Sequence, residues 1–154
     1  VCEKFGLIAL APQSAKAEKW EPTETAFVRK SLDDVATRYS IDPTRIATYG
    51  YQAGGAMAWL VGFEHVDKIR AICAVDAAPP ARSKAPENDP INRLAYYLAS
   101  GQKSPAAATL KAIATRLEAA KFPVVQRSLG DAPRDLTAEE LAELARWIDS
   151  LDRI

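Results

Sequence analysis

One short segment has the residue types of a catalytic turn, and it reads Gly50-Tyr51-Gln52-Ala53-Gly54-Gly55. It joins an apolar run that predicts a β-strand over residues 46–49 to a helical pattern over residues 53–63. A residue at the tip of such a turn is held out toward a substrate, and small neighbours let the two backbones crowd together. Position 52 carries glutamine, whose amide nitrogen is delocalised into its carbonyl. The segment therefore predicts a turn that exposes residue 52, but the glutamine there has no nucleophilic atom.

The segment, preceded by Asp42-Pro43-Thr44-Arg45-Ile46, resembles the nucleophile elbow of the α/β-hydrolase superfamily. The resemblance is to the dienelactone hydrolase, carboxylesterase and polyhydroxybutyrate-depolymerase-like branches, with Gln52 in place of the serine. It covers essentially the whole chain. It implies that Gly50, Gly54 and Gly55 are the structural glycines of the elbow.

The resemblance also fixes where the other two members of a catalytic triad belong. The acid is expected in the turn after the fourth strand, where the sequence places Ser104, and the histidine after the last strand, where it places Asp131. Ser104 is also explained as the N-cap of a helix that begins at Pro105. The single histidine, His65, matches a helix end that leads into another strand. Gln52, Ser104 and Asp131 are thus predicted to be vestigial triad positions.

A serine mechanism needs a hydroxyl, a base and a group that orients the base. Loss of one triad member costs roughly 10⁴ to 10⁶ in turnover. The resemblance therefore implies a catalytically inactive domain that acts as a binding or interaction module. The alternative is a hydrolase with altered chemistry, in which Asp76 or Asp131 serves as the base.

The candidate pocket residues are Tyr51 and Asp76, beside Gln52. Gln52 either hydrogen-bonds a ligand or is a relic position, and Asp76 either acts in a site or caps a loop. The tyrosines at positions 49, 51, 96 and 97 either line a cleft or pack beside strands. His65 is expected at the surface, at the end of a helix.

The remaining pattern alternates short apolar runs with segments of helical period, which is typical of an α/β fold with a mostly parallel sheet. It predicts a single domain over residues 1–154 with the three-layer architecture of the α/β hydrolases. Strands are expected at residues 6–11, 46–49, 71–75, 94–98 and 124–127. Helices are expected at residues 23–39 and 53–63, from residue 104, and from Thr137, where Thr137 and Glu140 have capping-box spacing.

The resemblance implies that the domain is truncated at its N-terminus. The strand of the parent fold that separates residues 6–11 from residues 46–49 would precede Val1. We therefore expect an incomplete sheet, or an intermolecular contact, beside residues 46–49. The chain also looks like degenerate hydrolase domains that follow trypsin-like protease and PDZ modules in secreted bacterial proteins. That likeness implies upstream domains as partners and a secreted or periplasmic location, although the sequence itself leaves the compartment open.

Composition excludes several other classes of protein. Twenty basic and twenty acidic residues give a net charge of zero, which disfavours nucleic acids and anionic membranes as partners. Two cysteines are too few for a disulfide scaffold, and Cys73 lies in an apolar run that predicts a buried thiol. No His, Cys or carboxylate spacing indicates a metal, and no motif calls for a cofactor. A protein partner or self-association remains as the expected interaction.

Overall fold

The computed structural model describes residues 1–16 and 19–154. Four parallel strands form one sheet in the order β1-β2-β3-β4. The strands are β1 (Ala47–Tyr51), β2 (Ala71–Val75), β3 (Ala95–Ser100) and β4 (Val124–Ser128). The helices are α1 (Cys2–Phe5), α2 (Thr25–Ala36), α3 (Ala53–Glu64), α4 (Ala107–Ala119) and α5 (Ala138–Asp149), with short 3-10 turns at Pro22–Glu24 and Leu151–Arg153. The predicted α/β class is confirmed.

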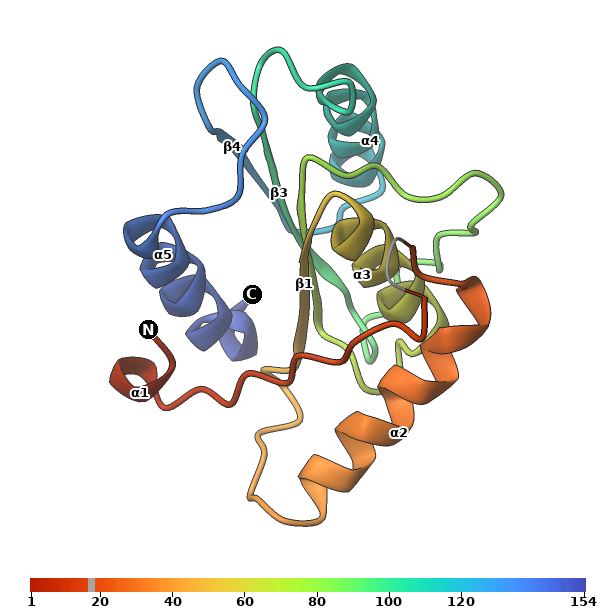
Figure 1. Cartoon of the computed structure of the whole chain (residues 1–154), viewed down its shortest axis with the longest axis vertical. Coiled ribbons are helices and arrows are strands. Elements are labelled where there is room, and N and C mark those ends of the chain that lie inside the picture. The colour runs from red at the N-terminus through yellow and green to blue at the C-terminus, as the bar shows by residue number, and fades with distance from the viewer. Residues whose placement is uncertain (17–18) are drawn as a thin grey trace.

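Helices cover both faces of the sheet. Figure 1 shows α5 on one face and α3 and α4 on the other, with α2 lying outside α3. Two apolar clusters correspond to these faces because side chains alternate along a strand. Ile72, Tyr96 and Leu98 point toward α3 and α4, whereas Cys73 and Tyr97 point toward α5. No described helix has the length and apolar character needed to cross a bilayer.

Strand β2 is buried at every residue, as its uninterrupted apolar sequence predicts for a central parallel strand. Its bounds agree with the prediction over residues 71–75, and the Cys73 thiol is buried as expected. Burial raises the pKa of that thiol. We therefore assign Cys73 to packing rather than to redox chemistry.

The predicted strand over residues 6–11 is wrong. Gly6 ends the short helix α1 in a left-handed conformation, and the chain beyond it belongs to no strand. Figure 1 shows this segment running across β1 and not alongside it. Ile8 and Leu10 remain 50% and 40% exposed. An apolar run becomes a strand only where a neighbouring strand completes its ladder, and none of the described strands lies beyond β1.

Two helix boundaries also differ from prediction. Helix α2 ends at Ala36, and Tyr39, the last residue of the predicted helix, is 57% exposed in the turn that follows. Helix α4 begins at Ala107, so Ser104 and Pro105 form a preceding turn and Ser104 is not the N-cap. The Ser104 hydroxyl still accepts a hydrogen bond from the Ala106 amide at 3.2 Å. The helix therefore begins two residues later than predicted, and the Ser104 hydroxyl bonds an amide in the turn before it.

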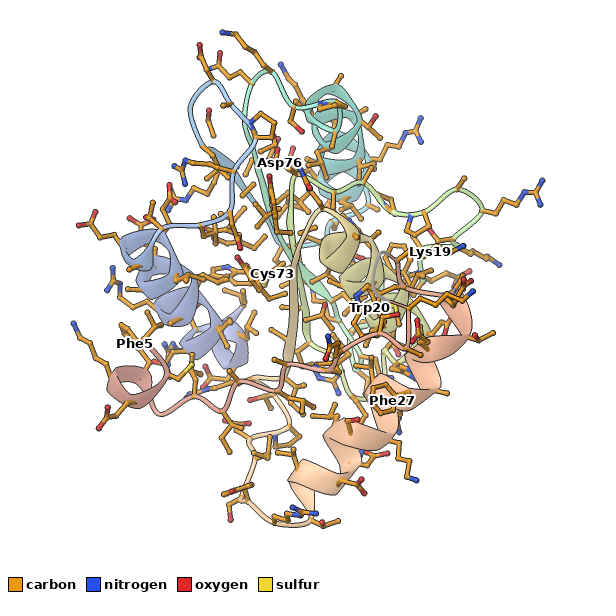
Figure 2. All side chains as sticks on the ribbon, in the orientation of Figure 1. Phe5, Lys19, Trp20, Phe27, Cys73 and Asp76 are labelled. Atoms are coloured by element: carbon orange, nitrogen blue, oxygen red, sulfur yellow. The ribbon has the colours of Figure 1, made fainter. Side chains whose placement is uncertain are left out.

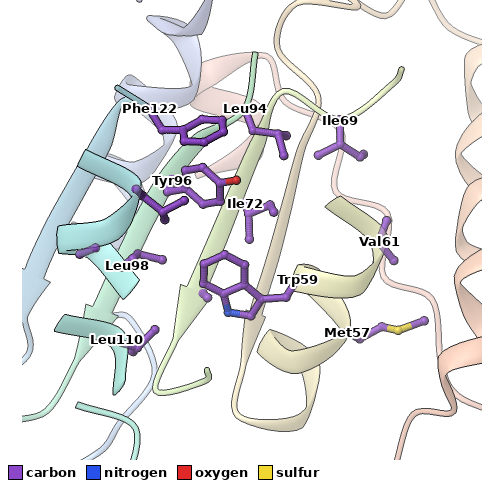
Figure 3. Packing of buried hydrophobic residues seen from close by; sticks show 13 residues of the cluster. Met57, Trp59, Val61, Ile69, Ile72, Leu94, Tyr96, Leu98, Leu110 and Phe122 are labelled. Carbon is purple, nitrogen blue, oxygen red and sulfur yellow. The ribbon is translucent and has the colours of Figure 1, made fainter. Parts of the chain in front are cut away.

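The largest apolar cluster contains an unpartnered hydroxyl. Tyr96 is fully buried between Trp59 and Phe122, with ring centroids 5.6 Å and 5.4 Å away (Figure 3). Its hydroxyl has no hydrogen-bond partner among the described residues. Burial raises the pKa of this phenol, so it stays neutral.

We expect Tyr96→Phe to raise the free energy of unfolding by about 1 kcal/mol, because the variant keeps the rings and removes a buried polar group without a partner. Chemical denaturation measures the change. Tyr97→Phe is the control, since the Tyr97 hydroxyl is not a fully buried polar atom without a partner, and it should be neutral or destabilising. A loss of stability in Tyr96→Phe would show that the hydroxyl has a partner in solution.

Candidate functional site

The carboxyl ends of β1, β2 and β3 meet at one edge of the sheet, and the turn after β1 carries the elbow. Gln52 has φ of 48° and ψ of −113°, a backbone conformation that residues other than glycine rarely adopt. The backbone amide of Gln52 donates to Val75 O at 3.0 Å, and its backbone carbonyl accepts from Ala56 N at 2.9 Å. These bonds to β2 and α3 hold the strained turn, which costs about 1–3 kcal/mol.

The glycines of the elbow have different roles. A Cβ on Gly50 would overlap the carbonyl group of Gly54, and a Cβ on Gly55 would overlap the Ala77 side chain and lie 2.8 Å from Gly50 O. A Cβ on Gly54 would meet nothing within 4 Å. The expectation that Gly54 must be glycine for space therefore needs correction. Close approach requires glycine at 50 and 55, and position 54 contributes only its backbone.

The Gln52 side chain is exposed at the tip of this turn, and its amide nitrogen donates to the Tyr51 hydroxyl at 3.0 Å. The predicted pocket residue Tyr51 is therefore in contact with Gln52. Neither supplies a nucleophile with an adjacent base. No group of three or more described His, Cys, Asp or Glu side chains is arranged to hold a metal ion.

Asp76 follows β2 (Figure 2). It is only 7% exposed. One carboxylate oxygen accepts the Gly101 amide and the other accepts the Arg134 amide, each at 3.0 Å. Its backbone φ is 46°, a conformation that aspartate tolerates better than most residues. Asp76 thus ties the turn after β3 to the loop before α5, as in the loop-capping interpretation of this residue. Both oxygens being occupied by backbone donors, it is poorly placed to take a proton from a substrate.

The two other predicted triad positions, Ser104 and Asp131, lie on loops that are hydrogen-bonded to each other. Gln102 N donates to Gly130 O, and Lys103 N donates to Asp131 O, both at 2.8 Å. The exposed Asp131 carboxylate pairs with the Lys103 ammonium at 2.8 Å. Ser104 is buried, and its hydroxyl serves the turn before α4. The fold therefore places the loops of residues 101–104 and 130–131 side by side at the carboxyl end of the sheet.

His65 lies at the opposite end of α3 from Gln52. Twelve helical residues separate the two, which is about 18 Å at 1.5 Å per residue. The imidazole is half-buried against α2, where Nε2 is 3.3 Å from Thr25 O and Nδ1 is 3.4 Å from Arg29. Arg29 in turn pairs with Asp67 through two bonds of 2.9 Å. The only imidazole of the chain is thus remote from the elbow.

The remaining tyrosines separate into core and surface. Tyr96 and Tyr97 are buried in the two apolar clusters, so the packing interpretation holds for them. Tyr49 is 40% exposed and donates to the Asp135 carboxylate. Burial and the Asp135 bond raise the Tyr49 pKa, so the phenol remains protonated. Sequence reasoning missed this pair, because no local pattern links β1 to the segment before α5.

Helix α5 begins as predicted, with Thr137 as its N-cap, and Arg134 adds a contact that the capping pattern does not predict. Thr137 Oγ1 accepts from Glu140 N at 3.3 Å, and Glu140 accepts from Thr137 N at 2.8 Å, which completes the capping box. Arg134 binds both Glu140 oxygens, at 2.7 and 2.8 Å. Hydrogen bonding to Arg134, together with the Thr137 bonds, lowers the pKa of Glu140 to about 2. The loop before α5 is therefore held at two points: the Arg134 amide binds Asp76, and the Arg134 side chain binds Glu140.

We expect Glu140→Gln to lower the free energy of unfolding by up to about 1 kcal/mol at neutral pH, because the amide keeps an acceptor for the capping box but loses the ion pair with Arg134. A carboxylate whose folded pKa lies below its ordinary 4.5 stabilises the protein above pH 4.5, and the contribution disappears as the pH falls through 2. Denaturation of both proteins between pH 7 and pH 2 should therefore show the difference shrinking with acid. Glu139→Gln is the control, and a difference independent of pH would contradict the assignment.

No protein-family sequence profile matches the chain, and no curated protein sequence matches it. Solved structures do. A carboxylesterase from Bacillus cereus is similar with a TM-score of 0.61 and 20% identity, over 90% of this chain and 67% of its own. A carboxylesterase from Mesorhizobium loti gives 0.64 and 16%, over 89% and 66%, and a ferulic acid esterase gives 0.63 and 17%, over 83% and 61%.

The fold, a parallel sheet between helix layers with an elbow after β1, is that of an α/β-hydrolase-like domain. The three similar structures named above are esterases, and the chain spans about two thirds of the length of those proteins. The predicted resemblance is confirmed at the level of the fold.

Proposed function

We propose that this chain is a catalytically inactive α/β-hydrolase-like domain that acts as a binding or interaction module. The observation that carries the proposal is the elbow itself. Its strained backbone and crowded glycines are present, while the exposed side chain is the Gln52 amide bonded to Tyr51. At the other two predicted positions, Ser104 stands in place of the acid and Asp131 in place of the histidine. The partner would be another domain of the same polypeptide or a separate protein.

Two features speak against the alternative of altered hydrolytic chemistry. Asp76 has both oxygens bound to backbone amides, and Asp131 is paired with Lys103. Each candidate base is therefore held by a structural contact. The proposal predicts that the protein neither hydrolyses p-nitrophenyl esters nor labels with a fluorophosphonate, and labelling of any serine would contradict it.

We expect Gln52→Ser to leave esterase activity at the background level. The new hydroxyl would have no imidazole to accept its proton, since His65 lies about 18 Å away along α3. Hydrolysis of p-nitrophenyl acetate and fluorophosphonate labelling measure the outcome, with Gln102→Ser, a substitution at another exposed glutamine, as the matched control. Turnover in Gln52→Ser above that control would mean that the site retains a base.

A further inference from the structure

The outer edge of β4 is free, and it lies beside a groove. Tyr96 N donates to Pro123 O and Leu129 N donates to Ser100 O, so the odd-numbered residues of this strand face β3. In a parallel ladder the alternate residues face the other way, which directs the backbone groups of Gln126 and Ser128 toward the open edge. Among the described strands, none pairs with that side of β4.

The groove runs between the carboxyl ends of β3 and β4 and the first turns of α4, and its volume is about 430 Å³. Leu98 and Leu110 provide an apolar floor. Ser100, Gln102 and Lys111 add polar groups to its wall. A volume of this size accommodates side chains of an extended segment.

The charge on the groove has one sign. Lys111 is exposed, and it forms no ion pair with any residue of the described ranges. The next carboxylate along this face of α4, Glu118, lies seven residues further on, about 10 Å along the helix, and is bonded by Gln126 at 3.1 Å. Arg127 also lines the groove, and its guanidinium pairs with Glu143 of α5 at 3.4 Å. No carboxylate lines the groove itself.

We propose that this edge binds an extended peptide segment that adds a fifth strand beside β4 and places an acidic side chain against Lys111. Main-chain bonds to an open edge provide affinity in this mode of recognition, and pockets for alternate side chains provide specificity. A second copy of the chain fits less well, because β4 reads Val-Val-Gln-Arg-Ser and offers no acid to Lys111. This inference deepens the proposed binding function and depends on it.

The test is selection of a random nine-residue peptide display library on the intact protein. Enriched peptides should alternate β-branched and other residues and carry Asp or Glu at one fixed position. A synthetic copy of the leading peptide should protect the amides of Gln126 and Ser128 from hydrogen exchange. Methylation of its alternate backbone nitrogens should abolish binding.

Charge reversal tests the role of Lys111. Lys111→Glu should weaken binding of the selected peptide at least about tenfold. A new selection on this variant should favour Lys or Arg at the same position of the peptide. Lys111→Arg should restore binding, and Lys30→Glu, an exposed change of equal charge on α2, should have no effect. Circular dichroism confirms that each variant is folded.

Several results would overturn the inference. They are failure to enrich any peptide, enrichment without an acidic position, binding that ignores Lys111→Glu, or a dimer that already protects the Gln126 and Ser128 amides. Peptides that bind elsewhere on the domain would overturn the β4 site and leave the binding function standing. Esterase activity or fluorophosphonate labelling would instead refute the proposed inactive role.

Discussion

Gly50→Ala is expected to lower the free energy of unfolding by more than about 3 kcal/mol, enough to leave a marginally stable domain largely unfolded. The alanine Cβ would overlap the Gly54 carbonyl carbon and oxygen and press on Gly55 N. These are backbone atoms of α3, which cannot move aside as a side chain does. The elbow would open, and α3 would have to shift on the sheet.

The matched control is Gly54→Ala. A Cβ at this position meets nothing within 4 Å, and alanine favours a helix over glycine by up to about 1 kcal/mol, so the variant should be neutral or more stable. Urea denaturation of the three proteins measures both effects. Equal, small changes in the two variants would show that β1 and α3 do not approach each other as closely as the structure has them.

Asp76→Ala is expected to lower the free energy of unfolding by about 3 kcal/mol. It removes the acceptor of two amides, Gly101 and Arg134, and a buried donor without a partner costs about 1–3 kcal/mol. Alanine is also less suited than aspartate to φ of 46°. Asp76→Asn should fall between the two proteins, since it keeps one acceptor oxygen and tolerates the same backbone conformation.

Hydrogen exchange locates the effect of Asp76. The Gly101 and Arg134 amides should lose protection in Asp76→Ala ahead of the amides of β2. Asp131→Ala, which removes an exposed carboxylate bonded to Lys103, is the control and should change stability by less than about 0.5 kcal/mol. Unchanged protection of the two amides would mean that Asp76 does not hold these loops.

Together these variants separate two roles that the elbow region combines. Substitution of Gly50 or Asp76 is expected to lower the free energy of unfolding, whereas Gln52→Ser is expected to leave esterase activity at the background level. A catalytically inactive domain, as proposed, would show this combination, because residues at the elbow would still stabilise the loops around it. Arg134 illustrates the dependence, since its amide binds Asp76 while its side chain binds Glu140.

Local sequence determined the elements whose signals are contained in a few neighbouring residues. The apolar run of residues 71–75 fixed β2, and the Thr137 and Glu140 spacing fixed the start of α5. The glycine-rich segment of residues 50–55, where a predicted strand meets a predicted helix, indicated the elbow. In each case the signal itself, an uninterrupted apolar run or a capping pair three residues apart, is contained in neighbouring residues.

Tertiary structure decided what depends on distant partners. Residues 6–11 have the composition of a strand, yet they form none, because a strand requires a neighbour that the sequence of the segment does not specify. The loop-tying role of Asp76 needed Gly101 and Arg134, 25 and 58 residues away, and the Tyr49 contact with Asp135 spans 86. The sequence by itself determined that position 52 has no nucleophile and that the one histidine lies elsewhere in the chain; only the fold decided which buried carboxylate holds the loops, since long-range hydrogen bonds leave no periodic pattern in a sequence.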